Sequence, residues 1–538
     1  MTSDAGHVRQ IASAATIVSA ATLVSRVLGF VRDMTIAWLF GAGMLADAFF
    51  MAFRIPSTLR ELLGEGALSA AFIPSFTRTA TREGRQAAWD LASAVMGTLV
   101  VVLLGVTLLG VILAPGIVHV MAWGPGFTGI PGKIPLTIQL LRVMFPYILL
   151  VGLAAFFMAI LNSLGHFLAP ALSPCVLNLV MIGAALLIAP HVSNPALPLA
   201  IAVIVGGAGQ LLIQIPAAIS RGWRPRLSVA PFDPRVREIA RLMAPGVAGL
   251  SITQINVFVG LSLASFLAQG SVAALTYAFR LVQFPIGVIG VAIATGALPV
   301  MAASFARDAI EELKGALQGS LRLAIFLTFP AMVGLILFRL PILHVLFERG
   351  AFTRPVTILT AEILLAYSLG LLFYISNRIL APAFYAMQDT WTPVTTGMMA
   401  VGVNIVVSIL LMGPLGAAGL ALATAVSSAG NFILLFTRLR RRVGLLGLRR
   451  LILPGTKVAL ACLPMAAWAV LSQVWWDVLT VPGTARKATL LCGEVAVALA
   501  LFAVSAAALR CEEFGWALAL LRRRPLRESE RDGTTKSQ

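Results

Sequence analysis

The chain has 538 residues, of which 59% are hydrophobic and only 12% are charged, and its mean hydropathy is +0.94. Soluble globular chains have about 45–50% apolar and about 25% charged residues, so the composition indicates an integral membrane protein. The formal net charge is +18. This excess does not indicate nucleic-acid binding, because most arginines lie in short gaps between apolar segments and no soluble basic domain is present.

Enzyme and metal motifs are absent from the sequence. The four cysteines form no CxxC pair, zinc spacing or disulfide framework, and no HExxH or P-loop occurs. We therefore expect no catalytic residue, no metal and no cofactor. The N-terminal "SAATIVSAAT" has small residues like a signal peptidase site, but the apolar run continues to Phe40, which predicts an uncleaved first helix.

Apolar runs long enough to cross a bilayer recur along the whole chain. A hydrocarbon core of about 30 Å needs about 20 apolar residues per helix, and fourteen such runs are found. The predicted spans are 11–39, 44–77, 89–114, 135–162, 168–190, 197–219, 236–268, 271–304, 315–342, 356–387, 392–412, 415–438, 453–476 and 485–510. A β-barrel is the alternative, but runs such as "LVVVLLGVTLLGVILA" do not alternate in polarity, which favours helices.

Positive charges predict the orientation in the membrane. Lys and Arg are concentrated after the even-numbered helices and in the C-terminal tail. They are Arg78, Arg82, Arg85, Arg221, Arg224, Arg226, Arg235, Arg237, Arg307, Lys314, Arg438, Arg440, Arg441, Arg442, Arg449, Arg450, Arg522, Arg523, Arg524 and Arg527. By the positive-inside rule that side is cytoplasmic, and both termini lie on it. Arg349 and Arg354, after the ninth helix, fit this pattern less well.

An internal repeat predicts two lobes of six helices. The second helix reads "AFR" and then "GALSAAFIPSFTR", and the eighth reads "AFR" and then "GALPVMAASFAR". Because six is even, the halves are parallel repeats, and such repeats place a transport site between them near mid-depth. The expected fold is an all-α polytopic membrane protein. Its domains are an N-terminal lobe (1–230), a C-terminal lobe (231–445), helices thirteen and fourteen (446–512) and a cytoplasmic tail (513–538).

Charged side chains in the first two predicted helices need partners or a water-filled cavity. Each costs about 2.5–3.5 kcal/mol near the bilayer centre. They are Arg26, Arg32, Asp33, Asp47, Arg54, Arg60, Glu61 and Glu65. Residues seven apart share a helical face, so ion pairs of Arg26 with Asp33 and of Arg54 with Glu61 are the structural alternative to a binding site.

Arg280 leads to a functional hypothesis. It lies well inside the eighth predicted helix, which has no acidic residue before Asp308, and the repeat makes it equivalent to Arg54. Two unpartnered arginines meeting across a cleft would repel each other unless an anion lay between them. The planar guanidinium group binds phosphate oxygens in pairs, so the sequence predicts a central anion site, with phosphate the leading candidate.

Helix breakers lie near both of these arginines. Pro56, Gly64 and Gly66 follow Arg54, and Pro285 begins a glycine-rich stretch after Arg280. Interrupted helices at matching positions of two repeats indicate a transport site. The second half offers only neutral oxygens for a cation, at Gln254, Asn256, Asn404, Ser408 and Thr424. For these, hydrogen bonding between helices is the default expectation.

Five segments together resemble the MurJ/MviN family of lipid II flippases, in the superfamily of multidrug, oligosaccharidyl-lipid and polysaccharide exporters. They are "SRVLGFVRD", "FGAGMLADAFFMAFRIPSTLRELLGEGALSAAFIP", "FPYILLVGLAAFFMAILNSLGHFLAPALSP", "SFLAQGSVAALTYAFRLVQFPIGVIGVAIATGALP" and "LAPAFYAMQDTWTPV". The resemblance covers nearly the whole chain and weakens beyond about Arg450. It implies transfer of lipid II, the undecaprenyl-pyrophosphate-linked cell-wall precursor, from the inner to the outer leaflet of the bacterial cytoplasmic membrane by alternating access, without enzymatic activity.

The resemblance also implies which residues bind the head group. The family's essential arginines match Arg26, Arg32, Arg60 and Arg280, and its basic position in the second helix matches Arg54. Supporting motif positions are Asp33, Asp47 and Glu65. The last two helices, about 453–510, resemble those that form a groove for the lipid tail. Lipid II and the membrane are the expected partners, other proteins of cell-wall synthesis are further candidates, and no nucleic acid is expected.

The sequence departs from its relatives where acids are often found, at Phe279 and Gln283, and in the second lobe at Gly260 and Ser408. These departures argue against sodium coupling. Alternatives to lipid II transport are a flippase for another undecaprenyl-linked glycan and a non-transporting scaffold of cell-wall synthesis that acts through the basic gaps and the tail. A drug exporter would need an acidic cavity for cationic drugs, whereas this one is predicted to be basic.

Overall fold

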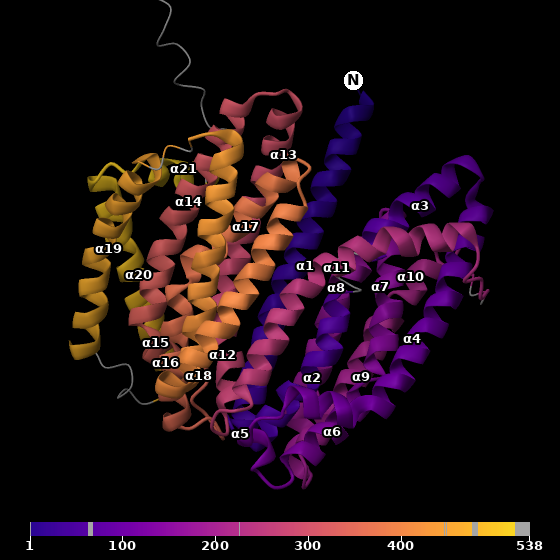
Figure 1. The fold of residues 1–538 in the computed structure, drawn as a ribbon, viewed down its shortest axis with the longest axis horizontal. Coiled ribbons are helices and arrows are strands. Elements are labelled where there is room, and N and C mark those ends of the chain that lie inside the picture. The colour runs from indigo at the N-terminus through magenta and orange to yellow at the C-terminus, as the bar shows by residue number, and fades with distance from the viewer. Residues whose placement is uncertain are drawn as a thin grey trace, which may run out of the picture. The chain divides into compact units, whose positions relative to one another are not determined.

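The structure is a computed structural model that describes residues 2–521 apart from 63–67, 225, 227, 446, 448 and 476–482. Over these residues every regular element is a helix (Figure 1), which confirms the predicted all-α class. The predicted tail, 513–538, begins inside α21 (Glu512–Leu521), and its residues 522–538 lie outside the described residues.

The chain forms two compact units, and the first consists of Met1–Tyr277 and Phe347–Thr357. Its helices are α1 (Thr2–Phe40), α2 (Met44–Leu62), α3 (Leu68–Arg82), α4 (Arg85–Met121), α5 (Pro125–Thr128), α6 (Lys133–Met144), α7 (Tyr147–Ser163), α8 (Leu168–Gly183), α9 (Ala196–Leu212), α10 (Ile215–Ile219) and α11 (Pro234–Ala264). A π-helical turn and a 3-10 turn extend α8 to His191. Within this unit α8 packs against α1 and α9, α2 packs against α6, and α3 packs against α4 and α7.

Helix α11 belongs to the first unit because its N-terminal half packs into an aromatic core. Phe76 lies 5.5 Å from Trp89 between ring centroids, and Val236 and Ile239 of α11 are buried in the same cluster. Aromatic side chains bury large areas, so this contact is a strong tertiary anchor. The predicted lobe boundary at 230/231, which rests on the sequence repeat, therefore differs from the boundary between compact units. The lobes remain a prediction.

The second unit consists of Ala278–Leu346 and Ile358–Gln538. Helix α12 (Ser271–Pro285) passes from the first unit into the second. The others are α13 (Val291–Ala306), α14 (Ile310–Leu337), α15 (Arg339–Leu346), α16 (Arg354–Leu369), α17 (Leu371–Ala386), α18 (Trp391–Val443), α19 (Arg449–Trp475), α20 (Thr484–Ala508) and α21. Helix α14 packs against α13, α17 and α19, and α19 packs against α20. A π-helical turn at Ile286–Gly290 follows Pro285, which confirms the predicted interruption.

Helix α18 is a helical hairpin that matches two predicted spans. Gly416 has φ 56° and ψ −133°, which breaks the helix. Glycine has no Cβ and adopts a positive φ at little cost. The two halves lie side by side, since Ser427 Oγ donates to the carbonyl of Ala400 at 2.6 Å. The break falls next to the predicted boundary between spans 392–412 and 415–438.

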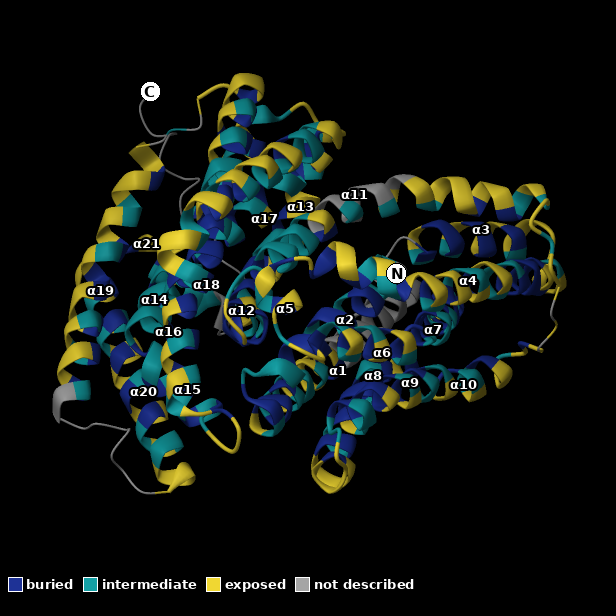
Figure 2. Cartoon of the chain, turned by 60° about the horizontal axis from the view of Figure 1, so that its bottom comes forward, coloured by how far each residue is buried: buried dark blue, intermediate teal, exposed yellow. Residues whose placement is uncertain are grey.

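Within the described residues nine helices are long and apolar enough to cross a membrane, or ten if the bent pair α16 and α17 is one span. This number counts α18 as one helix, although its two halves match two predicted spans. Helices α1, α2 with α3, and α11 occupy the remaining predicted spans. The number fourteen is consistent with this arrangement and remains a prediction. Figure 2 shows exposed residues along α4 and α19, where many are large and apolar, as on lipid-facing helices.

Candidate functional site

Two arginines of α2 converge on one carboxylate. Arg54 Nη2 lies 3.9 Å from Glu61 Oε2, and Arg60 Nη2 lies 3.8 Å from Glu61 Oε1. The first contact confirms the predicted pairing of Arg54 with Glu61, seven residues apart on one helical face. Both distances are ion-pair contacts without hydrogen-bond geometry. Two guanidinium groups are thus held close together inside a predicted membrane span.

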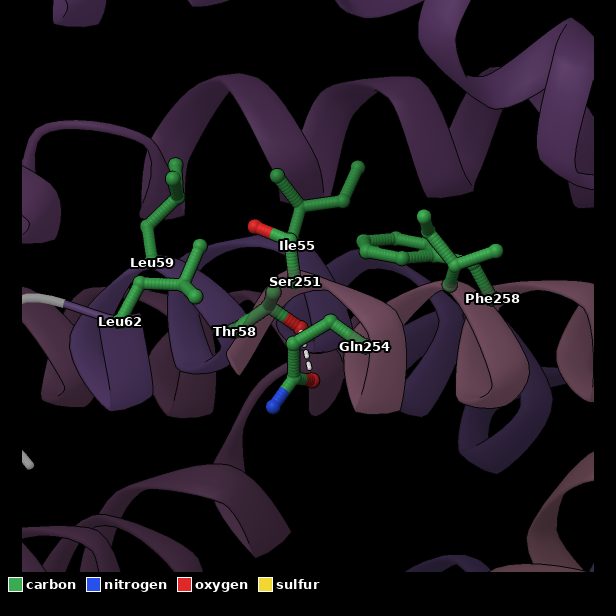
Figure 3. Close-up of a pocket in the computed structure, with 8 residues that line it drawn as sticks. Ile55, Thr58, Leu59, Leu62, Ser251, Gln254 and Phe258 are labelled. Atoms are coloured by element: carbon green, nitrogen blue, oxygen red, sulfur yellow. Dashed lines mark hydrogen bonds between the residues drawn. The ribbon is translucent and has the colours of Figure 1, made fainter. Parts of the chain in front are cut away.

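Gln254 of α11 bridges this pair. Its Oε1 accepts a hydrogen bond of 2.6 Å from Arg54 Nη2, and its Nε2 donates one of 2.7 Å to Glu61 Oε2. Thr58 Oγ1 also donates to Gln254 Oε1, at 3.3 Å (Figure 3). The short hydrogen bond of Arg54 is therefore made to a neutral amide. The sequence singled out Gln254 only as a weak cation ligand and did not predict that it would position an arginine.

Arg32 forms a second cluster, between α1 and α8. Its Nη2 lies 2.7 Å from Asp33 Oδ1, and its Nη1 donates to Asn178 Oδ1 at 3.1 Å. The predicted ion pair of Arg26 with Asp33 is wrong. Arg26 is exposed and makes no hydrogen bond or ion pair within the described part of the chain. The physical reason is Asn178, which accepts a hydrogen bond from Arg32. This hydrogen bond places the Arg32 guanidinium group beside the carboxylate of Asp33.

Asp47 is the centre of a third, fully buried cluster. Lys133 Nζ donates to Asp47 Oδ2 at 2.9 Å, and both side chains are 1% exposed. Asp47 also accepts from the backbone N–H groups of Gly270 and Ala273, at 2.7 and 2.9 Å, where α12 begins. Asp47 is therefore a structural anchor between α2, α6 and α12. Lys133 was missed as a partner, although a lone lysine in an otherwise uncharged gap was a usable signal.

A side-chain hydrogen bond joins α7 to α9 inside the first unit. The hydroxyl of Tyr147, at the start of α7, is fully buried. That hydroxyl donates a hydrogen bond of 3.3 Å to Gln210 Oε1 of α9. This hydrogen bond holds α7 beside α9, against which it packs.

The remaining predicted residues lie elsewhere. Arg280 is in the second unit, and its Nη1 donates to Gln283 Oε1 at 3.1 Å, so the prediction that it is unpartnered is wrong. Glu65 lies outside the described residues. A site shared by Arg280 and Arg54 rests on the sequence repeat and stays a prediction.

The neutral polar side chains of the second unit hydrogen-bond to one another. Asn404 Nδ2 donates to Thr424 Oγ1 across the two halves of α18, and Ser408 Oγ donates to Asn404 Oδ1 within one half, both at 3.3 Å. This is the default role that the sequence predicted for them. Among the described residues no group of three or more His, Cys, Asp or Glu side chains could hold a metal ion.

The helical bundle has the fold of solved membrane transporters. An inward-facing multidrug transporter of the MATE family has a similar fold, with a TM-score of 0.69 at 15% identity over 78% of this chain and 95% of that one. A solved structure of a lipid II flippase MurJ in an inward closed conformation has a TM-score of 0.76 at 25% identity. This match covers 95% of this chain and the whole of the solved MurJ chain.

Sequence comparison identifies the family. Residues 36–484 match the family model of the lipid II flippase MurJ. A probable lipid II flippase MurJ of Vibrio cholerae serotype O1 is 41% identical over 78% of this chain and 81% of its own length. A lipid II flippase MurJ of Burkholderia cenocepacia is 36% identical over 79% of this chain and 83% of its own length. The chain belongs to the lipid II flippase MurJ family.

Proposed function

We propose that this protein moves lipid II from the inner to the outer leaflet of the bacterial cytoplasmic membrane. Membership of the MurJ family supports the substrate, and the paired arginines of α2 support the mode of binding. The observation that most directly supports this binding is that guanidinium nitrogens of Arg54 and Arg60 both lie within 4 Å of the Glu61 carboxylate. The protein is a transporter, and no chemical step is assigned to it.

The pyrophosphate of lipid II fits this arrangement. Planar guanidinium groups bind phosphate oxygens through two parallel N–H groups, and such charge-assisted hydrogen bonds are about twice as strong as neutral ones. The contacts of Arg54 and Arg60 with Glu61 are long, so both guanidinium groups can turn to a pyrophosphate oxygen without breaking a short hydrogen bond of their own to the carboxylate, which keeps its hydrogen bond from Gln254. Gln254 then holds Arg54 in place through its side-chain oxygen.

The other predicted residues take distinct roles in this proposal. Exposed Arg26 is available to head-group oxygens, and Arg280 contributes from the second repeat. Arg32 is already tied to Asp33 and Asn178, so it sets a positive potential near the site while its guanidinium group stays fixed. The supporting acids Asp33 and Asp47 orient Arg32 and anchor α2.

Alternating access moves the bound head group. Both termini are cytoplasmic, the two repeats close around the pyrophosphate on that side, and they reopen on the other. The prenyl chain stays in the apolar part of the bilayer throughout, because a head group with charged and hydroxyl groups is the costly part to transfer across hydrocarbon.

Depletion of the resident flippase from bacterial cells tests this function. Cells that carry this chain are compared with cells that carry an empty vector, and lipid II is detected separately in each leaflet. We expect outer-leaflet lipid II to persist only with the chain. Equal outer-leaflet lipid II in both strains would contradict the proposal.

A further inference from the structure

Two apolar pockets lie next to the arginine pair of α2. One, of about 260 Å³, lies between α2 and α11 (Figure 3). The other, of about 440 Å³, lies between α2, α4 and α11. Ile55 and Phe258 line both, so the pockets adjoin. Together we call them the α2–α4–α11 pocket.

Polar groups occur at one end of the α2–α4–α11 pocket only. Thr58 and Gln254 line its smaller part, and Gln254 accepts the short hydrogen bond of Arg54. The larger part is lined by apolar residues and a glycine. They are Ile55, Leu113, Gly116, Ile117, Val120, Met121 and Phe258. The pocket therefore leads from neutral polar side chains, one of which holds Arg54, into an apolar space.

The larger part lies against the C-terminal segment of α4 and is open at the surface of that helix. Leu113 is 55% exposed and Val120 is 75% exposed. Exposed apolar side chains on a membrane-spanning helix face hydrocarbon. This end of the pocket thus suits a chain that continues into the bilayer.

We propose that the α2–α4–α11 pocket holds the isoprene units next to the pyrophosphate of lipid II. This proposal rests on the proposed function, and it adds a site for the lipid chain in the first unit. An amphiphile whose anionic group adjoins an apolar chain matches an apolar pocket whose polar end holds Arg54 through Gln254. The pocket then recognises the prenyl-linked form of the head group.

The α2–α4–α11 pocket is open at the surface of α4 and is not an enclosed void. In a membrane an open apolar hollow is filled by an apolar chain, and the nearby Arg54 favours a chain that carries an anionic group. Gly116 also keeps the larger part open, since a Cβ built on it meets no atom within 4 Å. A leucine at this position has room to extend over the pocket.

Gly116→Leu tests the site, and Gly105→Leu is the matched control. Both glycines lie in α4 with open space around a Cβ, but only Gly116 lines the pocket. Purified variants are titrated with lipid II and with an analogue in which a methyl group replaces the prenyl chain. We expect Gly116→Leu to weaken lipid II binding at least fivefold and to leave the methyl analogue unchanged. Gly105→Leu should change neither affinity.

Three results are decisive against the pocket. Equal lipid II affinity of the two variants overturns the pocket proposal. An equal loss of affinity for lipid II and for the methyl analogue in Gly116→Leu also overturns it, because that result indicates damage to the arginine site. In both cases wild-type protein still binds lipid II, so the proposed function stands. Failure of wild-type protein to bind lipid II removes the proposed function and the pocket with it.

Photocrosslinking provides a second measurement that does not fill the pocket. A benzoylphenylalanine replaces Ile117, which lines it, or Leu104, which is exposed on the same helix outside it. We expect the probe at position 117 to capture the prenyl chain of lipid II more often than membrane phospholipid. The probe at position 104 should show a lower ratio of lipid II to phospholipid. The same ratio at both positions means that bulk lipid fills the pocket and overturns the proposal.

Discussion

The buried ion pair of Lys133 with Asp47 yields a quantitative prediction. Removing one partner of a buried pair leaves an uncompensated charge and costs about 3–5 kcal/mol. In Lys133→Met the Asp47 carboxylate keeps its two backbone N–H donors at the start of α12 and a favourable helix dipole. We therefore expect the low end of that range, a loss of about 3 kcal/mol in the free energy of unfolding.

Denaturant titration of the purified protein in micelles measures this loss. Lys314→Met is the control, because Lys314, whose side chain is 14% exposed, pairs at 2.6 Å with Glu311, which is 87% exposed and stays hydrated when the lysine is removed. Such pairs contribute about 0–1 kcal/mol. Adding Asp47→Asn to Lys133→Met should recover at least about 1 kcal/mol, since no buried charge then remains. If both lysine variants lose the same small amount, the ion pair does not anchor α2.

Three further predictions concern single side chains. Gln254→Leu removes the amide that holds Arg54, so lipid II affinity should fall roughly tenfold in a binding titration, and unchanged affinity would exclude a positioning role. Arg32→Lys cannot contact both the neighbouring carboxylate and Asn178, so we expect a loss of about 1–2 kcal/mol in unfolding free energy, whereas full stability would contradict the cluster. Asp233 caps α11, and a hydrogen bond from the arginine two residues later lowers its pKa below the ordinary 3.8. Its stabilisation of about 1 kcal/mol should thus be complete above pH 3.8 and disappear as the pH falls through the lowered value, so wild type and Asp233→Ala should converge in acid.

The helical architecture followed from periodicity and length, and even the hairpin of α18 was predicted near Gly416. Residue spacing within one helix also predicted the pairing of Arg54 with Glu61. These features depend on local geometry, which 3.6 residues per turn fixes. Hydrogen bonding of Asn404 with Thr424 followed from the general behaviour of polar side chains between membrane helices.

Contacts between distant segments were harder to predict. Nothing in "SRVLGFVRD" indicates that Asn178 would bind Arg32 and so divert it to Asp33. The bridging role of Gln254 likewise needs α11 to lie beside α2, although the repeat assigns these helices to different lobes. Such partners depend on tertiary packing, which one sequence does not specify by spacing alone.

Transport of lipid II by reconstituted protein tests the central claim most directly. Proteoliposomes containing fluorescent lipid II are prepared with wild-type protein, with Arg54→Ala/Arg60→Ala, or with Arg78→Ala, whose exposed ion pair with Glu238 lies outside the site. Transfer between leaflets is followed by quenching from outside. We predict transfer by wild type and Arg78→Ala and loss of transfer in the double variant. Equal transfer by all three would contradict an arginine site for the pyrophosphate, and no transfer by wild type would contradict the flippase itself.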